Sequence, residues 1–126
     1  MEQTCKISVI VPCYYSEKTI AKAVHLAREE LLRLGYDYEF VLVNDGSTDG
    51  TFAQIQALCA EDPKVKGVDF SRNFGQHSAL MAALHYVTGD YVLSMDDDLQ
   101  THPSQFGKLL DTIRNGGYDV VYGWYP

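Results

Sequence analysis

Three consecutive carboxylates, Asp96, Asp97 and Asp98, follow an apolar run at residues 91–95. Adjacent like charges repel one another, so burying them together is costly unless a cation neutralises them. Asp96 and Asp98 are two residues apart and can point toward one ion, and the amide oxygen of Gln100 continues the spacing. Such oxygen ligands suit Mg²⁺ or Mn²⁺, which usually complete their coordination with water and a substrate diphosphate. The triplet therefore predicts a Mg²⁺ or Mn²⁺ site.

The same triplet is also typical of a solvated acidic turn before a helix, where aspartate is common. Its position favours the metal, because residues 91–95 predict a buried strand and ligands bind at the carboxyl ends of strands in open parallel sheets. The net charge of −7 agrees, since a diphosphate would be repelled unless a divalent cation mediated the contact. The same charge argues against nucleic acid or an anionic membrane surface as a partner.

Alternating strands and helices are predicted to position these acids. Apolar and β-branched runs predict strands at 7–11, 38–43, 65–70, 91–95 and 119–122. Apolar positions at helical spacing predict helices at 17–34, around 52–59, at 77–87 and from Pro103. The 126 residues therefore predict one α/β domain, a Rossmann-like, mostly parallel sheet with helices on both faces in three α/β/α layers.

The loops after the first four predicted strands are expected to share one edge of this sheet. They comprise residues 12–17, 44–49, 71–76 and 96–102. The glycine-rich phosphate loops G-x-G-x-x-G and G-x-x-x-x-G-K-[ST] are absent from the sequence. A nucleotide bound here would therefore be held through aromatic, acidic and metal contacts.

The three cysteines, Cys5, Cys13 and Cys59, form no C-x-x-C pair. Buried thiols in a reducing compartment explain them. The first residues do not resemble a signal peptide, and no apolar stretch approaches the ~20 residues that span a bilayer. We therefore expect a cytoplasmic segment.

Four segments resemble motifs of the family 2 glycosyltransferases, which have the GT-A fold. They are VIVPCY at 9–14, VNDGSTDGT at 43–51, SRNFG at 71–75 and DDDLQ at 96–100. The last two are most similar to the polyprenyl-phosphate branch, which includes dolichyl-phosphate mannose synthase and its undecaprenyl-phosphate relatives. The resemblance covers the whole chain and implies that residues 1–126 are the nucleotide-sugar-binding part of a GT-A domain, without the acceptor half and any membrane helices.

The resemblance also implies which residues contact the nucleotide. Pro12 and Tyr14 would flank the nucleoside, and Asp45 would form a hydrogen bond with the base. Each assignment has a structural alternative, because Asp45 could cap the following helix and Tyr14 could be a rim aromatic residue without a ligand. Arg72 could contact a phosphate oxygen or pair with a surface acid.

The first motif departs from the family pattern Pro-x-Tyr-Asn-Glu. Tyr15 and Ser16 occupy the positions of the asparagine and the glutamate, and Glu17 follows as a candidate nucleotide contact one residue later. An arginine commonly follows the fifth strand in this branch, whereas residues 123–126 read Gly-Trp-Tyr-Pro.

The resemblance implies an inverting transferase that moves a sugar from UDP or GDP to a polyprenyl phosphate. Asp96 and Asp98 would act in catalysis by holding, with Gln100, the metal on the donor diphosphate, and Asp97 would lie beside the nucleotide. Such a metal stabilises the leaving nucleotide as a Lewis acid. The full-length protein is expected at the cytoplasmic face of the membrane.

Three other functions compete with this hypothesis. The chain could bind nucleotide without catalysing transfer, or the acceptor could be a polysaccharide. A phosphoryl-accepting receiver or phosphatase domain also uses clustered aspartates and Mg²⁺, but places key acids at the end of its first strand, where this chain has Pro-Cys-Tyr at 12–14. An exposed fifth strand could also drive formation of a homo-oligomer.

Overall fold

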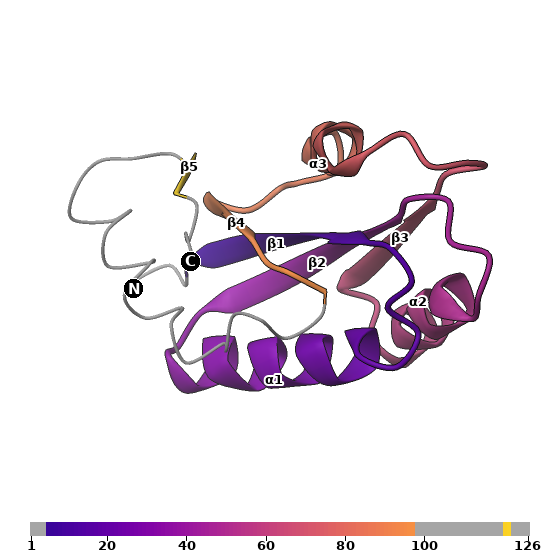
Figure 1. The fold of residues 1–126 in the computed structure, drawn as a ribbon. Helices are drawn as coiled ribbons and strands as arrows, with labels where there is room; N and C mark the ends of the chain where they lie inside the picture. The colour runs from indigo at the N-terminus through magenta and orange to yellow at the C-terminus, as the bar shows by residue number, and fades with distance from the viewer. Residues whose placement is uncertain (1–4, 98–119, 122–126) are drawn as a thin grey trace, which may run out of the picture.

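The computed structural model describes residues 5–97, 120 and 121. Its centre is a five-stranded sheet in the order β3-β2-β1-β4-β5, in which all described strand pairs are parallel (Figure 1). The strands are β1 (Lys6–Cys13), β2 (Asp37–Asn44), β3 (Val65–Asp69), β4 (Tyr91–Ser94) and β5 (Val120–Val121). The helices are α1 (Ile20–Arg33), α2 (Thr51–Glu61) and α3 (Gln76–Leu84). The predicted Rossmann-like α/β class is confirmed.

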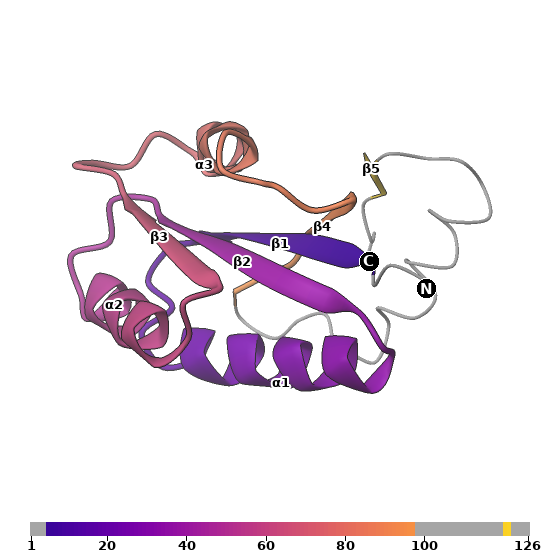
Figure 2. The ribbon, with the colours of Figure 1, turned by 180° about the vertical axis from the view of Figure 1, so that it is seen from behind.

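Helices cover both faces of the sheet. Figures 1 and 2 show α1 and α2 on one face and α3 on the other. Side chains alternate along a strand, so Val9 and Val11 of β1 join the core beneath α1 and α2, while Ile10 joins the smaller core beneath α3. The three-layer α/β/α arrangement expected from the sequence is therefore present.

Helix α1 begins at Ile20, three residues later than predicted, buries one stripe of apolar side chains and ends just before a glycine. The buried stripe comprises Ile20, Ala23, Val24, Ala27 and Leu31. Gly35 has a φ of 85°, and its N–H donates to the Leu32 carbonyl at 3.1 Å. The N–H of Tyr36 donates to the Leu31 carbonyl at 3.0 Å, which completes a Schellman motif. The chain can therefore reverse direction directly into β2.

Strand β1 continues past Pro12 to Cys13, two residues beyond the predicted strand at 7–11. The Ile10 carbonyl accepts the N–H of Met95 at 3.0 Å, so the backbone N–H and C=O groups of the even-numbered residues of β1 point toward β4. The missing N–H of Pro12 therefore points toward β4, whose pairing with β1 ends opposite Ile10. Because no ladder partner is lost, the proline is tolerated in an inner strand.

Helix α3 is shorter than predicted, and its last residue does not point into the core. The helix ends at Leu84 rather than near Val87, and Leu84 is 37% exposed. The buried side chains of α3 are Ala79 and Ala83, which lie one turn apart and approach the sheet closely. Leu84, the residue after Ala83, is rotated away from that contact.

The remaining predictions fall partly outside the described residues. The predicted fifth strand is confirmed at Val120 and Val121, which pair with β4 in parallel. The helix predicted from Pro103 lies outside the description, and formation of a homo-oligomer stays a prediction. Within residues 5–97, 120 and 121, none of the helices has the length and apolar character needed to cross a membrane.

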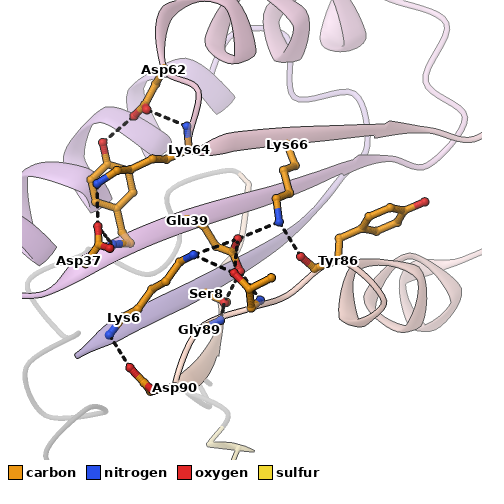
Figure 3. A network of polar contacts seen from close by, with 12 residues as sticks. Lys6, Ser8, Asp37, Glu39, Asp62, Lys64, Lys66, Tyr86, Gly89 and Asp90 are labelled. Carbon is orange, nitrogen blue, oxygen red and sulfur yellow. Dashed lines mark hydrogen bonds and ion pairs between the residues drawn. The ribbon is translucent and has the colours of Figure 1, made fainter. Parts of the chain in front are cut away.

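A network of polar contacts surrounds a buried carboxylate on the α3 side of the sheet (Figure 3). Its centre is Glu39 of β2, which is 2% exposed. The Glu39 carboxylate accepts hydrogen bonds from Ser8 Oγ at 2.6 Å and Thr88 Oγ1 at 3.0 Å, and lies 2.9 Å from Lys66 Nζ. The N–H of Gly89 donates to Ser8 Oγ at 2.8 Å. The network therefore fastens the segment between α3 and β4 to the two central strands.

Candidate functional site

A pocket of about 340 Å³ opens at the carboxyl edge of the sheet, within the size range of small-molecule sites. The loops after four different strands contribute to its wall. The lining residues are Pro12, Cys13, Tyr14, Asp45, Asn73, Gly75, Gln76, Asp96 and Asp97. The fold thus brings together five residues that the sequence nominated separately, namely Pro12, Tyr14, Asp45, Asp96 and Asp97.

Asp45 ties the loop after β2 to the loop after β3. Its side chain is buried, with Oδ1 accepting the N–H of Phe74 at 2.8 Å and Oδ2 accepting the N–H of Gly75 at 3.1 Å. Each carboxylate oxygen can accept a further hydrogen bond, so Asp45 can hold the loop and still accept a hydrogen bond from a ligand in the pocket. At the start of α2, whose N-cap residue is Gly50, it is Asp49 rather than Asp45 whose Oδ1 accepts the N–H of Thr51, at 3.0 Å.

Gly46 allows the backbones of these two loops to touch. It has a φ of 78°, and a Cβ atom built on it would lie 2.2 Å from the backbone nitrogen of Asn73 and 2.3 Å from the carbonyl carbon of Arg72. No side chain fits in that space. The glycine therefore sets the spacing between the loop at 44–49 and the loop at 71–75.

Two consecutive tyrosines form the part of the rim that follows β1. Tyr14 lines the pocket, and its ring packs edge to face against the ring of Tyr15 with centroids 4.6 Å apart. Tyr15 has a φ of 52°, a conformation that is uncommon for a bulky residue. Its N–H donates to Ser47 Oγ at 2.8 Å, and its hydroxyl lies 2.9 Å from Thr48 Oγ1. Tyr15, which is anchored to the loop after β2, therefore supports the Tyr14 ring.

The acidic turn after β4 is bound to the loop after β1. One carboxylate oxygen of Asp97, Oδ2, accepts the N–H of Tyr14 at 2.9 Å. The main-chain carbonyl of Asp97 accepts the hydroxyl of Thr19 at 2.7 Å. Sequence reasoning did not find Thr19, because its partner is 78 residues away and no local pattern connects them.

The predicted metal ligands are described only in part. Asp96 is half-buried and lines the pocket beside Asp97, whereas Asp98 and Gln100 lie outside the described residues. In the part of the chain that the structure describes, no three His, Cys, Asp or Glu side chains gather into a metal-binding group. Two adjacent carboxylates on one pocket wall nevertheless fit the oxygen chemistry of a hard divalent cation.

Glu17 and Arg72 are not among the residues that line the pocket. Glu17 is exposed, and its Oε2 accepts the N–H of Gly50 at 3.1 Å, at the start of α2. The Arg72 guanidinium lies 4.8 Å from the centroid of the Phe74 ring and is exposed to solvent. A direct nucleotide contact from either residue stays a prediction. The observed partner of Glu17 shows that it joins the first loop to the second.

Comparison with protein families and curated proteins shows that the chain is similar in sequence to known transferases. A family model described as glycosyl transferase family 2 matches residues 8–126. An undecaprenyl-phosphate 4-deoxy-4-formamido-L-arabinose transferase of Photorhabdus laumondii is 38% identical over 122 residues. The match covers 95% of this chain and 37% of the relative, so the chain spans little more than a third of the relative's length.

Two solved structures resemble the fold. The mannosyltransferase PcManGT from Pyrobaculum calidifontis, in complex with GDP-Man and Mn²⁺, matches with a TM-score of 0.73 and 25% identity, over 88% of this chain and 33% of that one. S. aureus TarS 1-349, in complex with UDP-GlcNAc, matches with a TM-score of 0.65 and 28% identity, over 87% of this chain and 31% of that one. Both similar proteins carry a nucleotide sugar.

Proposed function

Because the chain belongs to glycosyl transferase family 2, we propose that it forms the donor-binding part of a metal-dependent inverting glycosyltransferase. The observation that carries the proposal is the convergence of Tyr14, Asp45, Asp96 and Asp97 on one pocket at the carboxyl edge of a parallel sheet. Ligands bind at this position in open α/β sheets. The donor is a UDP- or GDP-sugar, as the complexes of the two similar structures suggest.

Different residues of the pocket wall contact different parts of the nucleotide sugar. Pro12 and Tyr14 flank the nucleoside, and the half-exposed Tyr14 ring offers a face for stacking on the base. Asp45, already held in place by two backbone N–H groups, accepts a hydrogen bond from the base. Because its carboxylate cannot turn without losing both bonds, it presents a fixed acceptor.

The acidic turn provides the part of the wall next to Tyr14. Asp96, together with Asp98 and Gln100, would hold Mg²⁺ or Mn²⁺ against the donor diphosphate. When bound, the divalent ion supplies Lewis-acid stabilisation of the leaving nucleotide. Asp97 lies beside the nucleotide, with its carboxylate oriented by the N–H of Tyr14.

The acceptor that we propose is a polyprenyl phosphate. Support comes from the relative that is 38% identical and is named for undecaprenyl phosphate. A phosphate oxygen is already an anion at neutral pH, so its attack on the anomeric carbon has little need of a general base. The lipid acceptor would place the reaction of the complete protein at the cytoplasmic face of the membrane.

Calorimetric titration with UDP and with GDP, each with and without Mn²⁺, tests the donor site. We expect one nucleotide to bind, and its affinity to rise when Mn²⁺ is present. Asp96→Asn removes a charge from the pocket wall while keeping the side-chain size, so it should weaken binding in Mn²⁺ by about tenfold or more, as loss of a charged contact does.

Asp37→Asn is the matched control for this experiment. Asp37 begins β2, at the opposite end of the strand from the pocket, and forms a surface ion pair with Lys64 at 2.7 Å. Asp37→Asn changes the net charge by the same amount as Asp96→Asn and should leave nucleotide affinity unchanged. Equal losses in the two variants would show a nonspecific charge effect, and absence of binding by the unmodified chain at millimolar nucleotide and Mn²⁺ would refute the proposed function.

A further inference from the structure

Thr19 lies at the N-terminus of a helix, but its side chain does not cap that helix. It is the N-cap residue of α1, a position where the hydroxyl normally accepts a backbone N–H of the first turn. No such side-chain bond is present at this N-cap. The hydroxyl instead donates to the main-chain carbonyl of Asp97 at 2.7 Å. A capping bond has been exchanged for a contact with the acidic turn.

The acidic turn is held at a second point by the same loop. While Thr19 binds the main chain of Asp97, the N–H of Tyr14 donates to its carboxylate at 2.9 Å. The loop that makes both contacts is itself fixed, because the Ser16 carbonyl accepts the N–H of Thr19 at 3.0 Å and of Ile20 at 2.9 Å. The central residue of the triplet is therefore clamped through its backbone and its side chain.

We propose that Thr19 is a positioning residue for the donor site, which sets the place of the acidic turn relative to Tyr14. This inference rests on the proposed function and deepens it. Asp96 and Asp98, the two predicted metal ligands, are the immediate neighbours of Asp97 in the chain. A hydrogen bond to the Asp97 carbonyl fixes the backbone that directly follows Asp96. Partners that orient metal ligands typically account for 10–100-fold in metal affinity.

The same clamp links metal binding to nucleotide binding. Tyr14 contributes its ring to the pocket and its N–H to Asp97, so a nucleotide that orders Tyr14 also orders the acidic turn. Such coupling is reciprocal, because an ion that raises nucleotide affinity must be bound more tightly in turn when the nucleotide is present. Loss of the Thr19 hydroxyl should reduce this mutual enhancement more than it reduces binding of nucleotide alone.

Thr19→Val removes the hydroxyl at nearly constant volume, whereas Thr19→Ser keeps the hydroxyl. The first measurement is the Mn²⁺ concentration at half-saturation, by calorimetry in the presence of whichever of UDP and GDP the unmodified chain binds. We expect Thr19→Val to raise this concentration about tenfold and Thr19→Ser to stay within about twofold of the unmodified chain. Nucleotide affinity without Mn²⁺ should change little in either variant.

Amide hydrogen exchange gives a second readout that needs no ligand. The N–H of Tyr14 is bonded to Asp97, whereas the N–H of Ile20 is bonded to Ser16 within the same loop. In Thr19→Val, exchange should accelerate at Tyr14 and stay slow at Ile20. Acceleration at both amides would indicate general loosening of the loop and would overturn the positioning role.

The outcomes separate this inference from the proposed function. If the unmodified chain binds nucleotide with Mn²⁺ and Thr19→Val binds it equally well, the positioning role is wrong and the proposed function stands. Equal weakening in the valine and serine variants would show that the hydroxyl is not the operative group. If the unmodified chain binds neither nucleotide in Mn²⁺, both proposals fail together.

Discussion

Gly46→Ala is expected to lower the free energy of unfolding by roughly 2–5 kcal/mol and to abolish nucleotide binding. A positive φ costs an L-residue about 1–2 kcal/mol, and forced overpacking adds about 1–3 kcal/mol. The methyl group would lie 2.2 Å from the backbone nitrogen of Asn73, so a flexible side chain cannot absorb the clash. The loop at 71–75 would have to move, and with it the N–H groups that hold Asp45.

Gly35→Ala is the matched control for this variant. Gly35 also has a positive φ, of 85°, but a Cβ atom built on it meets no atom within 4 Å. It should therefore show only the conformational cost of about 1–2 kcal/mol and keep full nucleotide affinity. Urea unfolding of the two variants measures the difference. Equal destabilisation would mean that the close approach of the two loops contributes nothing.

Glu39→Gln is expected to lower the free energy of unfolding at pH 7 by about 2–3 kcal/mol, because the buried carboxylate loses hydrogen bonds that its charge strengthens. Burial alone would raise the pKa of Glu39, but hydrogen bonds from Ser8, from the N–H and hydroxyl of Thr88 and from Lys66 outweigh it and lower the pKa to about 2. A glutamine cannot balance the positive charge of Lys66, which lies 2.9 Å from the carboxylate.

The lowered pKa of Glu39 also predicts a dependence of stability on pH. Because the folded protein binds the Glu39 proton more weakly than the unfolded chain, the contribution is fully present above the ordinary pKa of 4.5. It is lost as the pH falls from about 4.5 toward about 2. The difference in unfolding free energy between the unmodified chain and Glu39→Gln should therefore shrink over this interval.

Glu29→Gln is the control for the pH measurement. Glu29 is exposed on α1, so its replacement should leave both the stability at pH 7 and its dependence on pH nearly unchanged. Urea unfolding of the three proteins at pH 7, 5, 4 and 3 gives the comparison. A difference between the unmodified chain and Glu39→Gln that stays constant down to pH 3 would contradict the assigned role.

The sequence predicted the layout of the site because that layout follows from local patterns and one rule of topology. Runs of β-branched residues located the strands, and parallel strands place their carboxyl ends at one edge of the sheet. Asp45 and Asp96 lie 51 positions apart in numbering but line the same pocket for that reason. The end of α1 at Gly35 could likewise be predicted, since only glycine adopts a positive φ without cost.

The contacts that tune the site could not be predicted in the same way. Thr19 resembles an ordinary N-cap, and its hydroxyl partner is chosen by tertiary structure. The left-handed conformation of Tyr15 contradicts its intrinsic preference and is held by Ser47 and Thr48 from another loop. Glu39 occurs within an apolar strand, and no nearby residue in the sequence indicates that Lys6 and Lys66 will lie beside it. Each of these depends on segments that meet only after folding.

The central position of β1 in the sheet has a consequence for the order of events during synthesis. Its β2 partner follows after one helix, but its β4 partner comes much later, since the N–H of Lys6 bonds to an Asp90 carboxylate 84 residues further along. At typical rates of translation that segment emerges on the order of ten seconds afterwards. One edge of an apolar strand thus stays unpaired on the nascent chain, where it invites pairing with other chains. Refolding in a test tube should be correspondingly slow for a chain of this size, because distant strands must meet before the sheet can close.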